Sequence, residues 1–339
     1  MTGSAAPSST EPAAARRFPD FFIVGHAKSG TTAMYEMLSR HPQLYLPENK
    51  RGVGKEPWFF AQDNPNPQRS RARDISNTGR TAIKLEDYLS LFQGARADQM
   101  IGEGSTSYLW SRTAPARIHA ARPDARIIAI FREPASFLRS LHLELLQKGT
   151  ESEHDFRKAV ALDAERLQSR SIPERAYWPA ALIYSDRVRY VEQLERYHAL
   201  FGRERVLVLI YEDFRADNAA TMSRVMRFLG IEEVALESVA ANPTVAPRSA
   251  TLRSLTRGLK TGQQPVWRLL RGFGKRITSR SVRERVLYPV LPRVLFREPS
   301  PPDEDFMLEL RRRFKPEVVA LGDYLQRDLL TLWGYDRLD

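Results

Sequence analysis

The chain has 339 residues, a formal net charge of +11 and no cysteine. This length is enough for one large α/β domain with a sizeable core, and the lack of cysteine excludes disulfides and thiolate metal sites. No segment approaches the roughly 20 consecutive apolar residues of a membrane-spanning helix, so we expect a soluble, cytoplasmic protein.

The N-terminal segment has a composition unlike the rest of the chain. Residues 1–17 are rich in Ala, Ser, Pro and Thr and contain no apolar run. This pattern predicts a disordered leader without the apolar region of a secretory signal. We therefore expect a single folded domain over residues 18–339.

The first folded segment predicts an anion-binding loop. A buried-strand pattern ends at Gly25, a turn follows, and a helical run begins after Gly30. A strand, a glycine-bearing turn and a helix N-terminus together present backbone N–H groups to a phosphate. The glycine spacing matches half of a nucleotide phosphate loop. However, Thr31 and Thr32 replace the usual Lys-Ser/Thr pair, and the only lysine of the turn is Lys28.

A second cationic position follows another predicted strand, residues 126–131. A metal-dependent ATPase or kinase of this class usually has an acidic metal ligand at such a strand end, but this chain has Arg132. A guanidinium at this position suits a second phosphate, bound by two hydrogen bonds, better than a metal. Two separate anion sites indicate a nucleotide with phosphates at both ends.

The remaining pattern alternates strands with helices, which is typical of a doubly wound parallel sheet covered by helices on both faces. The predicted strands are residues 20–25, 99–103, 126–131 and 205–210. The predicted helices are residues 31–40, 112–121, 134–147, 154–169, 178–201, 216–229, 303–321 and 322–332. Residues 61–80 are polar and predict a surface loop.

The net charge comes from one segment. Residues 248–297 contain thirteen Lys or Arg and one acidic residue, which leaves the rest of the chain nearly neutral. Residues 260–280 combine an apolar helical face with surrounding basic residues. This pattern fits either an interfacial helix that contacts an anionic membrane peripherally, or an amphipathic lid over the active site. Gly272 and Gly274 weaken a helix here and favour the lid. No nucleic-acid-binding motif accompanies the charge.

These motifs resemble, in chain order, the sulfotransferases that use 3′-phosphoadenosine 5′-phosphosulfate (PAPS). The loop around Lys28 resembles their 5′-phosphosulfate loop, and Arg132 with Ser140 resembles their 3′-phosphate motif. Residues 55–60 (Lys-Glu-Pro-Trp-Phe-Phe) lean toward the heparan-sulfate and bacterial branches. Further matching pieces are residues 102–105 with Tyr108, residues 211–214, 228–230 and 329–333.

The resemblance implies a P-loop-like fold and a reaction. The expected reaction is in-line transfer of a sulfuryl group from PAPS to a hydroxyl or amine of a carbohydrate, lipid or natural-product acceptor. Lys28 would stabilise charge on the bridging oxygen, and no metal is required because Lys28, Arg132 and the helix terminus supply positive charge. The expected nucleotide-binding residues are Lys28, Ser29, Gly30, Thr31, Thr32, Arg132, Ser140, Tyr211 (against adenine) and Arg248.

The base that accepts the acceptor's proton has two candidates. Glu56 matches the catalytic carboxylate of heparan-type relatives, although Trp58 stands where they often have histidine. Glu103 ends a predicted strand, at about the place of the catalytic histidine of the aryl branch. We expect Glu56 to be the base and Glu103 to have a structural role.

Two other functions remain open from the residues alone. A P-loop kinase would need a lysine after Gly30 and an acidic strand end, and both are missing. A non-enzymatic binder of anionic polymers or membranes would use residues 248–297, but it would leave Lys28 and Arg132 without a role. The acceptor's identity is not encoded in any motif, because it depends on loops such as 61–80 and 250–300.

Overall fold

The computed structural model describes residues 17–48, 55–61, 84–174, 176, 178–237, 239, 246–247, 296–297 and 299–338. Most of the leader predicted over residues 1–17, most of the loop predicted over residues 61–80 and most of the basic segment therefore lie outside the described residues. Within the described parts, no helix is long and apolar enough to cross a membrane.

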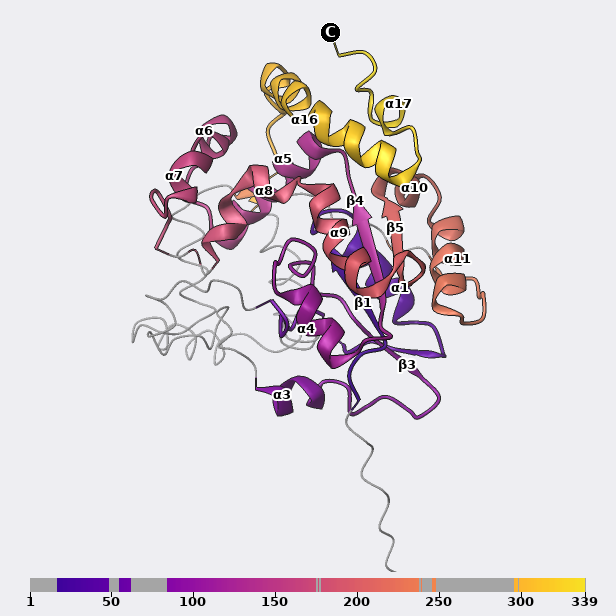
Figure 1. Cartoon of the computed structure of the whole chain (residues 1–339). Coiled ribbons are helices and arrows are strands. Elements are labelled where there is room, and N and C mark those ends of the chain that lie inside the picture. The colour runs from indigo at the N-terminus through magenta and orange to yellow at the C-terminus, as the bar shows by residue number, and fades with distance from the viewer. Residues whose placement is uncertain are drawn as a thin grey trace, which may run out of the picture.

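A parallel sheet of five strands forms the centre of the molecule (Figure 1). The strand order is β2-β3-β1-β4-β5, and every neighbouring pair is parallel. The predicted doubly wound α/β sheet is thus confirmed. The strands are β1 (Phe21–Gly25), β2 (Leu44–Tyr45), β3 (Met100–Glu103), β4 (Arg126–Phe131) and β5 (Val206–Ile210).

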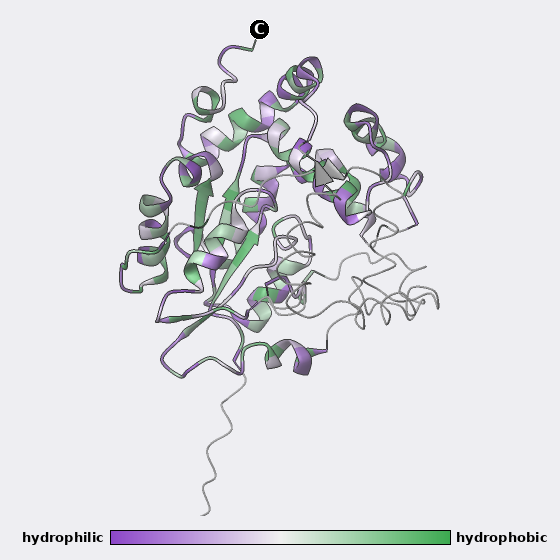
Figure 2. Cartoon of the chain, turned by 180° about the vertical axis from the view of Figure 1, so that it is seen from behind, coloured by the Kyte–Doolittle hydropathy of each residue, from purple (hydrophilic) through white to green (hydrophobic). Residues whose placement is uncertain are grey.

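Side chains of the central strands alternate between two hydrophobic cores, one on each face of the sheet. Phe22 and Val24 of β1 enter the larger core, whereas Phe21 and Ile23 enter the smaller one. All four are fully buried, as strands covered on both faces require. The hydropathy colouring shows the central strands as hydrophobic arrows inside the molecule (Figure 2).

Helices cover both faces of the sheet. The smaller core is closed by α1 (Thr31–Leu38) and α11 (Asn218–Leu229), and by Phe214 of α10 (Tyr211–Ala216). The larger core is closed by α4 (Ala114–Ala121), α5 (Pro134–Lys148), α9 (Tyr190–Phe201), α16 (Glu304–Leu325) and α17 (Leu329–Trp333). Smaller helices are α3 (Leu85–Ser90), α6 (Phe156–Ala161), α7 (Asp163–Leu167), α8 (Tyr184–Arg187) and the 3₁₀ turns Pro179–Leu182 and Arg203–Arg205.

Two predicted long helices are interrupted. Residues 154–169 form α6 and α7, and residues 178–201 form a 3₁₀ turn, α8 and α9. The second interruption has a tertiary cause: the Asp163 carboxylate accepts the backbone N–H groups of Tyr184 and Ser185, each at 2.8 Å, and so fixes a new helix start. The short strand β2 and helix α3 were not predicted.

Two C-terminal helices are present, as predicted, with a different boundary, and both pack on the larger core. Helix α16 extends to Leu325, and α17 follows only after a break at Gln326, which has a left-handed backbone. Helix α16 packs on α5, α9 and α17 (Figure 1), and Trp333 of α17 contacts Glu212 of α10.

The residues at the two ends of the basic segment lie beside each other. Strand β6 (Ala246–Pro247) pairs antiparallel with β7 (Phe296–Arg297), so the residues on either side of the segment are neighbours. Strand β6 also contacts α5, and the guanidinium of Arg139 on α5 donates to the carbonyl of Ser300.

Candidate active site

The predicted site residues follow the carboxyl ends of four neighbouring strands. The Lys28 loop follows β1, Gly104 follows β3, Arg132 follows β4 and Tyr211 follows β5. Parallel sheets bind ligands at this edge, where the strand order changes direction. The topology therefore gathers segments that are far apart in the sequence.

The loop after β1 has the form of an anion cradle. Gly30 begins α1 with a φ of 83°, and a Cβ there would come within 2.9 Å of the Phe214 ring. No side chain caps the first turn of α1, and that turn carries no acidic residue. Ser29 is fully buried, yet its hydroxyl has no hydrogen-bond partner. An orphaned hydroxyl beside uncapped helix amides fits a phosphate-type ligand.

Arg132 joins this loop to the neighbouring strand end. Its Nη1 donates to the Lys28 carbonyl oxygen at 2.9 Å, and its guanidinium lies 4.9 Å from the centre of the Tyr211 ring. Lys28 itself has a left-handed backbone with a φ of 62°. The structure therefore brings Lys28, Arg132 and Tyr211 together, although 183 residues separate the first from the last in the sequence.

The N-terminus of α5 is already occupied by a carboxylate. Glu133 accepts the N–H groups of Ala135 and Ser136 at 2.9 and 2.7 Å, and it also accepts the Tyr335 hydroxyl at 2.5 Å. The first amides of α5 are thus used inside the protein. An anion beside β4 would depend on the Arg132 guanidinium instead.

Two predicted nucleotide-binding residues are less closely defined. Ser140 is buried in the second turn of α5. Arg248 lies outside the described residues, directly after β6, which contacts α5.

Glu56 is held in place by three polar groups. Its carboxylate accepts the Thr106 hydroxyl and the Trp58 indole N–H, each at 3.2 Å, and Lys55 Nζ lies 3.7 Å away. The glutamate side chain remains 25% exposed, so the carboxylate can meet a ligand.

Lys55 connects this carboxylate to the anion loop. Its Nζ donates to the Thr32 hydroxyl at 2.8 Å, and the residue is buried. Burial lowers the pKa of Lys55, while the nearby Glu56 and Glu144 carboxylates oppose that shift. One lysine thus links the candidate base to the first turn of α1.

Glu103 has entirely different surroundings. It is fully buried, and one of its oxygens accepts the hydroxyls of Tyr88 and Tyr108 at 2.8 and 3.1 Å. Burial raises the pKa of Glu103 to about 7, with hydrogen bonds from Ser105 and the two tyrosines opposing the shift. This carboxylate sits in an aromatic core, not on a surface that an acceptor can reach.

His26 also has a structural environment. Its Nε2 lies 2.7 Å from Gln193 Oε1, and the Gln193 amide donates to the carbonyls of Asp186 and Arg187. Burial lowers the pKa of His26 well below its ordinary value, and the charge of Arg187 adds to that shift. His26 is thus neutral at pH 7.

Sequence reasoning missed a group of residues beside Glu56. Glu144 and Lys148 of α5 form an ion pair, and Arg187 of α8 lies over the Trp110 ring. Burial opposes ionisation of Glu144, but Lys148, Lys28 and Lys55 hold its pKa below the ordinary value. Glu144 and Lys148 are an i,i+4 pair within α5, but only tertiary packing brings them and Arg187 near Glu56, and no local pattern shows that.

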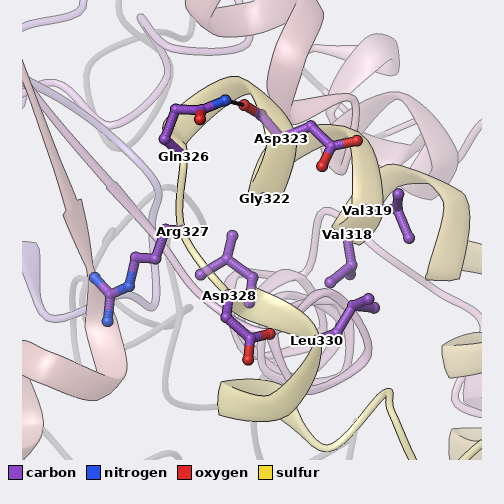
Figure 3. Close-up of a pocket in the computed structure, with 9 residues that line it drawn as sticks. Val318, Val319, Gly322, Asp323, Gln326, Arg327, Asp328 and Leu330 are labelled. Carbon is purple, nitrogen blue, oxygen red and sulfur yellow. Dashed lines mark hydrogen bonds between the residues drawn. The ribbon is translucent and has the colours of Figure 1, made fainter.

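A hollow between α16 and α17 lies apart from this constellation (Figure 3). It is lined by Val318, Val319, Gly322, Asp323, Gln326, Arg327, Asp328, Leu329 and Leu330. None of the predicted site residues lines it. Within the described residues, no group of three or more His, Asp or Glu side chains is arranged to hold a metal ion.

Comparison with known proteins gives consistent similarities. Residues 19–235 match the model of a sulfotransferase family. Carbohydrate sulfotransferase 15 of Mus musculus is 28% identical over 308 residues, covering 76% of this chain and 52% of the relative. Heparan sulfate glucosamine 3-O-sulfotransferase 6 of Homo sapiens is 30% identical over 219 residues, covering 65% of this chain and 54% of the relative. The chain spans about half the length of these curated relatives.

A solved structure has the same fold. The sulfotransferase from Alicyclobacillus acidocaldarius superposes with a TM-score of 0.61 at 24% identity, over 93% of this chain and 98% of that one. The likeness therefore extends beyond the segment that the family model matches.

Proposed function

The chain belongs to the sulfotransferase family, and we propose that it transfers a sulfuryl group from PAPS to a hydroxyl or amine of an acceptor. The contact that carries this proposal joins the two anion sites: Arg132 Nη1 donates to the Lys28 carbonyl at 2.9 Å. It brings a loop lysine beside an arginine at the next strand end, where a metal-dependent phosphotransferase would have an acidic ligand. Two cationic positions side by side suit a nucleotide with phosphates at both ends.

In this proposal, the donor lies along the carboxyl edge of the sheet. The amides of α1 and the buried Ser29 hydroxyl bind the 5′-phosphate, together with Thr31 and Thr32. Arg132 binds the 3′-phosphate with Ser140 and Arg248, and Tyr211 contacts the adenine. The stacking of Arg132 on the Tyr211 ring supports this division, because it puts a cation and an aromatic surface in one place.

The transfer step breaks one sulfur–oxygen bond of the donor and forms one bond from sulfur to the acceptor oxygen or nitrogen. The acceptor oxygen or nitrogen attacks sulfur in line, the bond from sulfur to the phosphate oxygen breaks, and Glu56 takes the acceptor's proton. Lys28 stabilises the negative charge that builds on the leaving phosphate oxygen. Lys55 orients Glu56 relative to this loop, since it contacts both Glu56 and Thr32.

A carbohydrate is the favoured acceptor class within this proposal. The relatives' names specify carbohydrate and heparan sulfate glucosamine acceptors. A lipid or another natural product with a free hydroxyl is compatible with the same chemistry. A screen of acceptors with labelled PAPS would identify the product class.

Nucleotide binding provides the direct test. Calorimetry of the full chain with 3′-phosphoadenosine 5′-phosphate (PAP), in EDTA and in magnesium, should give the same affinity in both buffers. Arg132→Ala should weaken binding by about 1.5–3 kcal/mol, the loss expected for charge-assisted hydrogen bonds to a phosphate.

Arg203→Ala is the matched control. Arg203 also lies over an aromatic ring, that of Tyr324 at 4.4 Å, but it precedes β5 and so lies at the opposite end of the strand from Tyr211. Its removal should leave PAP affinity unchanged. An absolute requirement for magnesium, or tighter binding of ATP than of PAP, would refute the sulfotransferase proposal.

A further inference from the structure

The first turn of α9 contacts both segments that we assign to the donor, the Lys28 loop after β1 and the Arg132 segment after β4. Tyr190, the first residue of the helix, donates its hydroxyl to the backbone carbonyl of Arg132 at 2.9 Å. Gln193 lies in the same turn, and its side-chain oxygen accepts the Nε2 proton of His26 at 2.7 Å. His26 precedes Lys28 by two residues. One helix is therefore bonded to both segments.

These contacts form a closed path with the one that joins the two anion sites. Arg132 Nη1 donates to the Lys28 carbonyl oxygen, and Lys28 and His26 belong to one loop. The path runs from this loop through Gln193, along α9 to Tyr190, and back through Arg132. Supporting contacts of this kind fix the geometry of a binding site, because each segment is held from more than one side.

The orientation of the Gln193 amide is determined by its other contacts. The amide nitrogen donates to the carbonyls of Asp186 and Arg187 at 3.1 and 3.2 Å, so the amide oxygen is the atom that faces His26. An amide oxygen only accepts, and His26 therefore carries its proton on Nε2. Burial lowers the pKa of His26 well below its ordinary value, and the charge of Arg187 adds to that shift. The ring thus stays neutral at pH 7 and keeps this contact.

Tyr190 is held by packing as well as by its hydroxyl. The residue is fully buried, and its ring lies 5.3 Å from the His26 ring and 4.7 Å from the Phe131 ring. Burial raises the pKa of Tyr190 well above its ordinary value, so the hydroxyl keeps the proton that it donates. Glu317 of α16 accepts the backbone N–H of Val191 at 3.0 Å. The start of α9 is therefore anchored to a second helix.

We propose that Tyr190 and Gln193 are positioning residues, which hold the Lys28 loop and the Arg132 segment at the spacing of a nucleotide with phosphates at both ends. They act through Arg132 and His26 and not by contact with the donor. A fixed spacing favours only a ligand that occupies both anion sites at once, since such a ligand then need not order the two segments. This inference rests on the proposed function and concerns how its donor site is built.

Three nucleotides distinguish positioning from a general effect on stability. We would measure by calorimetry the affinities of PAP, adenosine 5′-phosphate and adenosine 3′-phosphate for the full chain. Tyr190→Phe removes only the hydroxyl and should weaken PAP binding about fivefold, as the loss of one hydrogen bond allows. Each monophosphate uses one anion site, so its affinity should change by less than about twofold. The affinity advantage of PAP over each monophosphate should therefore fall.

Tyr197→Phe is the matched control. Tyr197 lies on the same helix, is fully buried and donates its hydroxyl to the backbone carbonyl of Tyr108 at 2.8 Å. Tyr108 belongs to neither donor segment. Loss of the Tyr197 hydroxyl should lower the free energy of unfolding, measured in urea, about as much as loss of the Tyr190 hydroxyl. All three nucleotide affinities should remain unchanged.

A double variant tests whether the two residues act in one path. Gln193→Leu removes the contact with His26 and should also weaken PAP binding about fivefold. Because the two contacts lie in series, the double variant Tyr190→Phe, Gln193→Leu should lose little more than either single variant, whereas independent contacts would multiply to about 25-fold. If Gln193→Leu does not fold, His26→Phe removes the same contact from the other side and keeps an aromatic ring.

Several results would overturn the inference. They are an unchanged PAP affinity in Tyr190→Phe, equal losses for PAP and both monophosphates, equal effects of Tyr190→Phe and Tyr197→Phe on PAP, or losses that multiply in the double variant. Failure of the wild-type protein to bind PAP would instead contradict the proposed function, so the two failures are distinguishable.

Discussion

Glu56 and Glu103 differ in what their carboxylates can reach. Glu56 is partly exposed and contacts Lys55, which reaches the anion loop, whereas Glu103 is enclosed by Tyr88 and Tyr108. Glu56→Gln should therefore lower kcat by about 100-fold and leave PAP affinity nearly unchanged, because only the proton acceptor is lost. Single-turnover kinetics and calorimetry on the same preparation would measure both quantities. A drop of that size in Glu103→Gln, with little change in Glu56→Gln, would assign the base to Glu103.

The buried Glu103 should make stability depend on pH. Burial raises its pKa from the ordinary 4.5 to about 7, so the folded protein keeps a proton that the unfolded chain has already released. The retained proton stabilises the folded protein. This stabilisation is complete below about pH 4.5 and is lost as pH rises through 7, which lowers the free energy of unfolding by about 3 kcal/mol. Urea unfolding of wild type and Glu103→Gln at pH 4.5, 6 and 7.5 would isolate this effect. As pH rises, the free energy of unfolding of the wild type should fall relative to that of Glu103→Gln. A difference in unfolding free energy that does not change with pH would contradict the prediction.

Candidate site residues could be named from the sequence where a local motif carried them. Lys28, Arg132 and Glu56 stand in short segments that resemble family motifs, and their roles stay predictions. Arg187 and Trp110 were not predictable, because they are 77 residues apart and meet only through tertiary packing.

Side-chain contacts hold the C-terminal segment against α10. The Arg327 guanidinium meets both oxygens of Asp213 in α10 at 2.5 and 2.6 Å, and the Trp333 indole of α17 donates to Glu212 at 2.8 Å. Helix α10 begins with Tyr211, under Arg132. The C-terminal helices therefore support an element that we assign to the nucleotide.

Removal of the ion pair between Arg327 and Asp213 should have measurable effects. Arg327→Ala should destabilise the protein by about 1 kcal/mol, the upper range for a partly exposed ion pair, and raise the Kd for PAP a few-fold. Thermal unfolding and calorimetry would report the two effects. Arg337→Ala, in which an exposed arginine 3.8 Å from Asp336 is lost, is the control and should change neither. Unaltered stability and affinity in Arg327→Ala would show that α10 holds its position without this contact.

Strands were easier to predict than helix boundaries. The strand predicted at residues 126–131 matches β4 at both ends, since a fully buried strand is a continuous apolar run bounded by polar residues. The helix predicted over residues 178–201 was wrong at its start because Asp163, some 20 residues away, sets the beginning of α8. The predicted helix is continuous only from Tyr190 onward, where α9 begins.

At the scale of the whole molecule, alternating strands and helices were enough to predict a parallel sheet, but not its strand order. The order β2-β3-β1-β4-β5 depends on which strands pair across long connections, and two-residue strands such as β2 give almost no signal. The convergence of the four strand ends thus became visible only in three dimensions.

The charge distribution leads to a prediction about membranes. Most of the net charge is concentrated in residues 248–297, outside the described residues. We expect the protein to remain in the soluble fraction during flotation with anionic liposomes at physiological salt, because electrostatic attraction alone is screened there. Co-flotation at that salt concentration would support the interfacial-helix hypothesis over the lid hypothesis.

The pairing of β6 with β7 has a consequence for how such a chain can diversify. Pro247 pairs with Phe296 across β6 and β7, so the segment between them begins and ends at neighbouring positions. Lengthening or exchanging an insertion of this kind costs little in loop-closure entropy. A relative's segment grafted between Arg248 and Phe296, with Arg248 kept, should therefore leave the sheet and the proposed donor site intact while importing a new acceptor preference.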